Sequence, residues 1–244
     1  MQHLDLTLDS PAANLACDEA LLDACDDQTG GEVLRFWEPE QCFVVVGYSN
    51  DVAREVNVAA CHQAGIGILR RCSGGGTVLQ GPGCLNYCLI VKTDGHPSLK
   101  TITGANRHIM ARHRDALARA LGQPVEVQGF TDLTIGGLKF SGNAQRRKRH
   151  ALVFHGTFLL RFDLGLMERF LPVPSRQPDY RKGRPHDRFL TNLGAPAAVI
   201  KSALREAWAA HVPLVAAPDC RKLIAEKYSQ DGWNLRIEKK TAPT

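Results

Sequence analysis

Residues 69–87 read LRRCSGGGTVLQGPGCLNY, with three consecutive glycines between two apolar segments. Glycine is costly in backbone entropy, so such a run needs a reason. Without side chains the backbone can approach a ligand closely and present N–H groups to an anion. Arg70 and Arg71 directly precede the glycines and can supply charge to a phosphate or a carboxylate. A flexible hairpin with two solvated arginines explains the pattern about equally well, because short glycine-rich matches are common by chance.

A second stretch, residues 130–145, reads FTDLTIGGLKFSGNAQ. Lys139 has apolar neighbours on an expected strand, where it can act as a fixed point charge on a phosphate. Asp132 lies on the strand before it and can hold a magnesium ion. Taken alone, the stretch is better explained as an edge strand whose lysine guards against pairing.

The third stretch is Phe154-His155-Gly156-Thr157. A lone histidine beside a strand glycine is more often a hydrogen-bonded core or turn residue than a catalyst. No Ser-His-Asp or Cys-His-Asn order is evident around it, and G-x-S-x-G is absent. A hydrolase triad is therefore not expected.

The composition indicates a globular protein, with 44% hydrophobic and 23% charged residues. The net charge of +5 suits an anionic ligand or an acidic partner but is too small to imply nucleic acid. No apolar run is long enough to span a membrane, and the N-terminus lacks the pattern of a secretory signal. The eight cysteines lie mostly in apolar segments without C-x-x-C, so we expect reduced thiols, no structural zinc and a cytoplasmic protein.

Apolar periodicity predicts a single α/β domain over residues 1–244, built on a mixed, largely antiparallel sheet flanked by helices. Helices are expected over residues 12–25, 57–64, 102–121, 200–211 and 218–230. Strands are expected over residues 32–37, 42–47, 66–71, 84–92, 125–128, 132–135, 139–144 and 151–160. Residues 171–188 are rich in proline and basic residues, which is typical of an exposed, mobile loop.

The order and spacing of the three stretches closely resemble the lipoate–protein ligase family of the biotin/lipoate ligase superfamily. Residues 14–22 (NLACDEALL) and 36–50 (FWEPEQCFVVVGYSN) are similar to the opening helix and first strand pair of that family. Residues 187–193 (DRFLTNL) resemble the segment that closes its catalytic core. The resemblance covers roughly residues 12–235 and implies the ligase catalytic domain without the C-terminal accessory domain that many bacterial members carry. A separate accessory protein is then expected to replace that domain.

The resemblance implies a two-step reaction. Lipoate and ATP form lipoyl-AMP with the help of Mg²⁺, and a lysine of a lipoyl-acceptor protein then takes the lipoyl group. Lys139 would be catalytic, placed between the carboxylate and the α-phosphate, and Asp132 would help to hold magnesium. The remaining residues would bind lipoate or ATP: Arg70, Arg71, Ser73, Gly74, Gly75, Gly76, Thr77, Val78, Leu79, Asn86, Ser141, Gly142 and His155.

Other activities remain open. An octanoyl- or lipoyl-transferase of the same family would pass the acyl group through a cysteine thioester. Residues 128–131, where similar transferases carry that cysteine, contain none, although Cys72 and Cys84 lie near the expected site. Biotin ligases resemble one another through a G-R-G-R-x loop that differs from this one. Nucleic-acid binding through the basic residues 146–150 is not expected, because no aromatic stacking pattern accompanies them.

One departure from the family concerns the residues before Asp132. Family members often show Arg-Asn there, and this chain has Phe130-Thr131. The contact of that asparagine is therefore replaced or lost.

Overall fold

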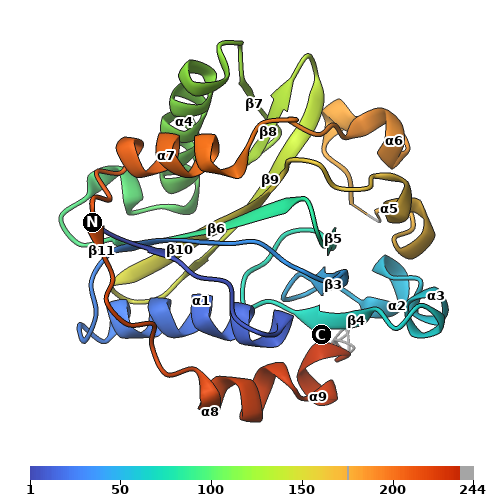
Figure 1. The fold of residues 1–244 in the computed structure, drawn as a ribbon, viewed down its shortest axis with the longest axis horizontal. Coiled ribbons are helices and arrows are strands. Elements are labelled where there is room, and N and C mark those ends of the chain that lie inside the picture. The colour runs from blue at the N-terminus through green and yellow to red at the C-terminus, as the bar shows by residue number, and fades with distance from the viewer. Residues whose placement is uncertain (175, 237–244) are drawn as a thin grey trace, which may run out of the picture.

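The computed structural model describes residues 1–174 and 176–236. Its centre is a sheet with the strand order β11-β1-β2-β6-β10-β9-β8-β7. Helices α4 (Ile102–Leu121) and α7 (Ala197–Ala207) cover one face of this sheet, and α1 (Pro11–Asp26) lies on the opposite face (Figure 1). A smaller sheet, with the order β4-β3-β5, lies on the same side as α1 (Figure 1).

The strands of the large sheet are β1 (Gln2–Asp5), β2 (Val33–Trp37), β6 (Cys84–Lys92), β7 (Glu126–Gln128), β8 (Asp132–Ile135), β9 (Leu138–Arg147), β10 (Ala151–Leu159) and β11 (Val212–Pro213). Those of the small sheet are β3 (Phe43–Val46), β4 (Gly67–Arg70) and β5 (Val78–Gln80). The other α-helices are α2 (Val52–Glu55), α3 (Val58–Gln63), α5 (Gly165–Phe170), α6 (His186–Phe189), α8 (Arg221–Leu223) and α9 (Asp231–Asn234). Short 3₁₀ turns η1 (Pro97–Leu99) and η2 (Asp179–Arg181) and a π-helical turn η3 (Ile224–Tyr228) complete the order.

The large sheet is antiparallel from β2 to β7, and only β1 pairs in parallel, with β2 and β11. The predicted α/β class with a mixed, largely antiparallel sheet is thus confirmed. Strand β6 is central, as its apolar positions predicted, and every residue except Lys92 is buried.

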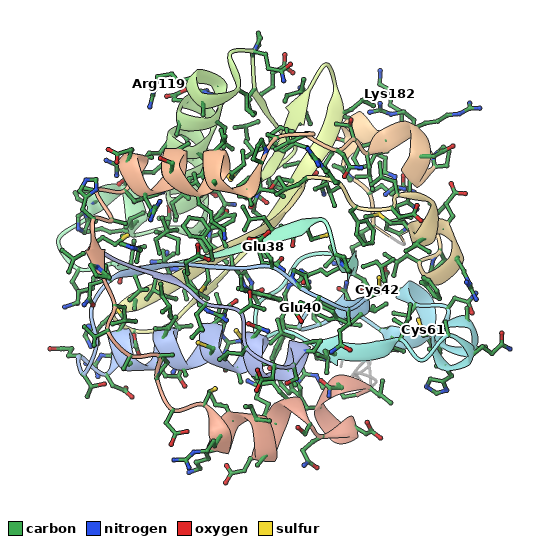
Figure 2. The ribbon with its side chains drawn as sticks, viewed as in Figure 1. Glu38, Glu40, Cys42, Cys61, Arg119 and Lys182 are labelled. Carbon is green, nitrogen blue, oxygen red and sulfur yellow. The ribbon has the colours of Figure 1, made fainter. Side chains whose placement is uncertain are left out.

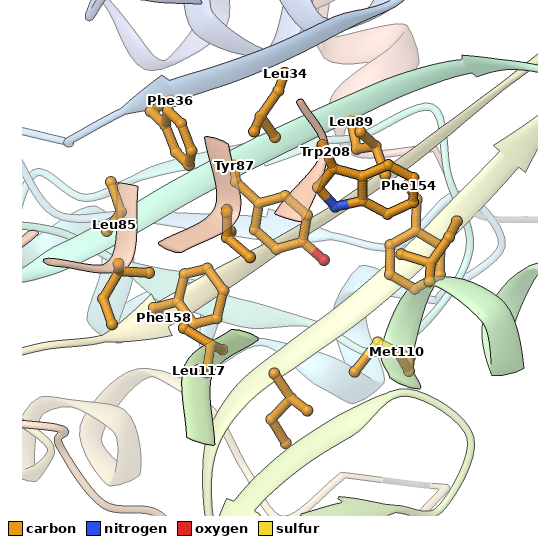
Figure 3. Packing of buried hydrophobic residues seen from close by; sticks show 14 of the residues in the cluster. Leu34, Phe36, Leu85, Tyr87, Leu89, Met110, Leu117, Phe154, Phe158 and Trp208 are labelled. Atoms are coloured by element: carbon orange, nitrogen blue, oxygen red, sulfur yellow. The ribbon is translucent and has the colours of Figure 1, made fainter. Parts of the chain in front are cut away.

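The main core fills the space between the large sheet and helices α4 and α7. Tyr87, Phe154, Phe158 and Trp208 meet there (Figure 3), and the rings of Tyr87 and Phe158 stack with centroids 5.3 Å apart. Each large apolar side chain buried in this way stabilises the fold by about 1.5–3 kcal/mol. This packing holds β6 and β10 rigid and leaves their other face for the site described below.

Most described residues of the segment 171–188 are exposed, as was predicted, but the segment is not an irregular loop throughout. It contains η2 and the start of α6, and the side chains of Arg181 and His186 are buried. Lys182 does project from the surface (Figure 2), where its backbone takes a left-handed conformation. The mobility of the segment stays a prediction.

The predicted last helix, over residues 218–230, is present but shorter, because α8 passes directly into the π-helical turn η3 and the helical segment ends at Tyr228. The short strands β1, β5 and β11 and the helices α2, α5 and α9 were not predicted. Among the described residues, no helix combines the length and the apolar character needed to cross a membrane.

Candidate active site

The register of the three central strands gathers polar side chains on the α1 face of the sheet. Asn86 pairs with Thr157, which pairs with Gly142, and in the next row His155 pairs with Ala144. Side chains alternate along each strand, so these residues point away from the core that holds their neighbours Tyr87 and Phe158. The site is therefore built on the face opposite α4 and α7.

A β-bulge directs Lys139 to this face. Leu133 of β8 pairs with Ser141, but the next residue, Thr134, pairs with Lys139, so Phe140 is an extra residue in β9. A bulge of this kind shifts the alternation by one position and re-aims the side chains beside it. Lys139 consequently lies over Gly142, where a Cβ atom would come within 2.8 Å of the lysine Nζ.

Asp132 pairs with the Lys139 ammonium and is itself held by Tyr180. Asp132 Oδ1 lies 2.8 Å from Lys139 Nζ, and the Tyr180 hydroxyl donates to Asp132 Oδ2 at 2.7 Å. Burial and the nearby carboxylate raise the pKa of Tyr180, so its hydroxyl keeps its proton. The Lys139 side chain is 24% exposed, which leaves its charge accessible to a ligand.

The same contacts bear on the predicted magnesium role of Asp132. Both carboxylate oxygens are engaged, by Lys139 and by Tyr180. Within the described part of the chain, no three His, Cys, Asp or Glu side chains gather as a metal cluster. These residues do not fit a magnesium ion held by the protein alone, although magnesium often relies on substrate phosphates for most of its ligands. The metal role of Asp132 stays a prediction.

Arg71 shapes the glycine loop, residues 74–76, from beneath. Its Nη2 donates to the carbonyl oxygens of Gly74 and Gly76 at 2.6 and 2.7 Å. In a trans peptide the following N–H points opposite to the carbonyl, so the N–H groups of Gly75 and Thr77 point away from Arg71. Gly75 has a left-handed backbone with φ 87°, and Gly75 and Gly76 are exposed. The loop thus presents N–H donors outward, as an anion-binding nest does.

The charge of Arg71 is buried without a counter-ion. The residue is 8% exposed, and no Asp or Glu in the described ranges forms an ion pair with it. Burial lowers the pKa of Arg71 to about 10, so the guanidinium remains charged at neutral pH. A buried charge that lacks a partner is costly, and an anion bound at the loop would offset that cost.

The loop and the lysine strand adjoin. A Cβ at Gly75 would lie 3.4 Å from Cβ of Ala144, which is two residues from Gly142 on β9. The nest and the Lys139 ammonium therefore flank the same face of β9, one on each side of Gly142.

Arg70 does not take the role predicted for it. Its guanidinium is fully buried and donates to main-chain carbonyls of Gly47, Tyr48, Asn50 and Trp233 at 2.8–3.1 Å. Neighbouring residues of an extended chain point to opposite sides, so only Arg71 faces the glycine loop. Arg70 instead holds the small sheet to the chain around residue 233.

Other predicted lining residues support the site from below or lie elsewhere. Asn86 is 3% exposed and forms a closed network with Gln80 and Thr157. Ser141 is buried on the core face, opposite Leu133 and Phe158, so its predicted place in the site is wrong. The side chain of Leu79 packs in the core of the small sheet, which leaves only its backbone for a ligand. Thr77, at the end of the loop, accepts a hydrogen bond from Asn50, and Val78 begins β5, partly exposed.

A chain of contacts joins three residues that were not expected to meet. Ser73 Oγ lies 2.5 Å from His155 Nε2, and His155 Nδ1 lies 3.9 Å from Asp18 Oδ2. The sequence order had not predicted these contacts. Ser73 is fully buried, however, so the arrangement does not present a nucleophile. Asp18 and Tyr180 were not predicted as site residues. For Asp18 there was one signal, because it is an acidic residue on the otherwise apolar, buried face of α1.

Comparisons with known proteins agree on the family and include both ligases and octanoyltransferases. A family model described as the lipoyl protein ligase A/B catalytic domain matches residues 10–200. The chain is similar to a putative lipoate-protein ligase A from Aeropyrum pernix, with 31% identity over 69% of this chain and 61% of that protein. It is also similar to an octanoyltransferase LipM from Lysinibacillus sphaericus, with 26% identity over 93% of this chain and 95% of that protein. Its fold matches a bi-partite lipoate protein ligase from Thermoplasma acidophilum with a TM-score of 0.80, 23% identity and 98% coverage of both chains.

Proposed function

Because the chain belongs to the lipoyl protein ligase A/B catalytic domain family, we propose that it activates lipoate with ATP and transfers the lipoyl group to a lysine of an acceptor protein. The observation that carries this proposal is the buried, uncompensated charge of Arg71 behind an outward-facing nest, with Lys139 beside it. This arrangement suits a phosphate at the loop and a second anion near Lys139.

In the first step the lipoate carboxylate attacks the α-phosphorus of ATP. An oxygen–phosphorus bond forms, and the bond to the β-phosphate breaks as pyrophosphate leaves. The N–H groups of Gly75 and Thr77 and the charge of Arg71 hold the α-phosphate. Lys139 stabilises the negative charge that develops between carboxylate and phosphate, and it does so without reorganisation because Gly142 and Asp132 fix its position.

In the second step the amine of the acceptor lysine attacks the acyl carbon. A carbon–nitrogen bond forms, the mixed-anhydride bond breaks, AMP leaves, and the amine protons go to solvent. Lys139 and the nest stabilise the charge on the departing phosphate. The protein supplies positioning and electrostatics in both steps and no nucleophile of its own.

The partners follow from the same proposal. The Thermoplasma acidophilum structure is described as a bi-partite ligase with its E2 lipoyl domain. We infer a lipoyl domain as acceptor here too, and a separate accessory protein as a further partner. The segment 171–188 contacts Asp132 through Tyr180 and carries the exposed basic residues Arg176, Lys182 and Arg188, which suit an acidic acceptor surface.

The second candidate is an octanoyl- or lipoyl-transferase, which the similarity to LipM over almost the whole chain favours. Such an enzyme needs a reactive thiolate. Burial raises the pKa values of Cys72 and Cys84 to about 12, and both thiols are at most 5% exposed. Burial also raises the pKa of Cys42, which is only partly exposed. The thiols near the site are therefore poorly suited to thioester chemistry, and the ligase is preferred.

One experiment separates the two candidates. The purified protein is incubated with an acceptor lipoyl domain and either lipoate, ATP and Mg²⁺ or an octanoyl-loaded carrier protein without nucleotide, and products are identified by mass. The experiment is run with and without an accessory protein. We expect lipoyl-AMP and ATP-dependent acceptor labelling. Labelling from the carrier alone, together with an acyl adduct on a cysteine, would establish the transferase and refute the ligase.

A further inference from the structure

The orientation of Arg71 depends on one hydroxyl. Ser73 Oγ accepts a hydrogen bond from Arg71 Nε at 3.1 Å and lies 2.5 Å from His155 Nε2. A serine hydroxyl has a single proton to donate. If His155 Nε2 is unprotonated, that proton goes to the histidine, and the oxygen lone pairs remain for Arg71.

Asp18 lies on the Nδ1 side of the His155 ring and can favour one tautomer of the histidine. Asp18 Oδ2 lies 3.9 Å from Nδ1, while Asp18 Oδ1 pairs with Arg35 at 2.5 Å. Burial alone would raise the pKa of Asp18, but the Arg35 guanidinium beside it holds that pKa below its usual value, so the carboxylate is ionised. A proton on Nδ1 faces this carboxylate favourably, whereas a bare Nδ1 would set a lone pair against a negative charge.

We propose that Asp18, which contacts no substrate, is a positioning residue for the nucleotide site. It favours the His155 tautomer with the proton on Nδ1, in which Nε2 accepts from Ser73 and both lone pairs of the Ser73 oxygen remain for Arg71 Nε. Arg71 in turn draws the carbonyls of Gly74 and Gly76 inward and turns the loop N–H groups toward the ligand. This inference deepens the proposed function and rests on it, since the ligand of the loop is taken to be a nucleotide phosphate.

The contacts from Asp18 through His155 to Ser73 are buried, so water cannot replace them. The side chains of Asp18 and His155 are 6% and 10% exposed, and Ser73 is fully buried. A buried polar group that loses its partner costs more than an exposed one, because water cannot replace the lost bond. A change at Asp18 should therefore reach Arg71.

Two substitutions of His155 test the proposal through AMP binding, measured by calorimetry. A glutamine can present its side-chain oxygen near the place of Nε2, whereas the shorter asparagine reaches only the place of Nδ1. We expect His155→Gln to retain AMP affinity within about threefold and His155→Asn to weaken it about tenfold, the size of one buried hydrogen bond. The matched control is the same pair of changes at His113, a buried histidine that accepts from Trp208 in the main core. The His113 variants should bind AMP as the unmodified protein does.

Asp18→Asn is the second test, with Asp23→Asn on the same helix as its control. Asp23 pairs with Lys148 at 2.9 Å, away from the loop. We expect Asp18→Asn alone to weaken AMP binding. Because Asp18 also pairs with Arg35, thermal unfolding is followed in parallel. If Asp18→Asn does not fold, the proposal is tested by the His155→Gln and His155→Asn variants.

A spectroscopic signature gives an independent result. Nitrogen-15 NMR of the unliganded protein should show neutral His155 with its proton on Nδ1, and Asp18→Asn should shift the population toward the Nε2–H tautomer. An Nε2–H tautomer in the unmodified protein, or equal AMP affinities for His155→Gln and His155→Asn, would overturn the proposal. If the unmodified protein binds no AMP, the proposed function fails instead, and the spectrum still decides the tautomer.

Discussion

The glycine loop and the Lys139 strand present two cations to the same face of the sheet, but they hold them differently. Arg71 is buried, and hydrogen bonds to Ser73, Gly74 and Gly76 fix it. Lys139 is partly exposed and has one ion pair, with Asp132. Arg71 lacks an acidic partner within the described ranges, whereas Lys139 has one that a substrate carboxylate or phosphate can replace.

Arg71 is therefore a fixed charge that suits binding, and Lys139 is a charge whose partner can exchange during a reaction. A fixed charge binds the same group throughout a reaction and costs little reorganisation. An exchangeable charge can follow a negative charge as it moves between carboxylate and phosphate. Changes at the loop should therefore act mainly on nucleotide affinity, and changes around Lys139 mainly on rates.

The largest effect is expected from Lys139→Ala, which removes the exchangeable charge. The rate of lipoyl-AMP formation should fall by about a thousandfold, as when an electrostatic stabiliser of the transition state is lost. Single-turnover assays measure the rate, and calorimetry should show AMP affinity almost unchanged. Lys222→Ala on α8, an exposed position, is the control and should have no effect. A normal rate of adenylate formation by Lys139→Ala would show that the assigned role is wrong.

A smaller effect is expected from Gly142→Ala, which keeps the charge but moves it. The new methyl would lie 2.8 Å from Nζ and 2.9 Å from Cε of Lys139, so the side chain must shift. Misplacement by about 1 Å costs about a hundredfold in rate. Gly67→Ala is the control, because a Cβ there meets no atom within 4 Å. Equal rates for the two variants would contradict the placement of Lys139 over Gly142.

The smallest effect is expected from Tyr180→Phe. Without the hydroxyl, Asp132 loses one hydrogen bond and holds Lys139 more tightly. The rate should fall about fivefold, in line with a single hydrogen bond, and AMP affinity should stay the same. A loss of AMP affinity without a change in rate would instead place Tyr180 in the nucleotide site.

The elements that the sequence predicts best are those with local signals at both ends. Helix α4 begins and ends as predicted because Thr101 caps its first turn and Gly122 takes the left-handed conformation after its last. Strand β6 was equally clear from its apolar run. The contacts of the segment 171–188 were not predicted because they are made with distant strands, as is that of Tyr180 with Asp132.

The site was predictable in its residue types and less so in its geometry. A pair of arginines gives no local sign of which one faces the loop, and the structure assigns Arg71 to the site and Arg70 to the scaffold. The bulge at Phe140, which turns Ser141 inward and Lys139 outward, depends on pairing with β8. Asp18 contributes through burial against β2 and β10, and such long-range contacts leave no periodic pattern.

The hydrogen bonds of Arg70 also have a consequence for biosynthesis. Arg70 N donates to Asn234 Oδ1 at 3.0 Å, and Trp233 Nε1 donates to Arg70 O at 2.8 Å. The ribosome adds these two partners more than 160 residues after Arg70. A nascent chain that ends before them can pair β3 with β4 but lacks the clamp on the strand that leads into the glycine loop. Organisation of the glycine loop should therefore wait until translation has passed residue 234, and stalled or truncated chains should bind the proposed nucleotide poorly.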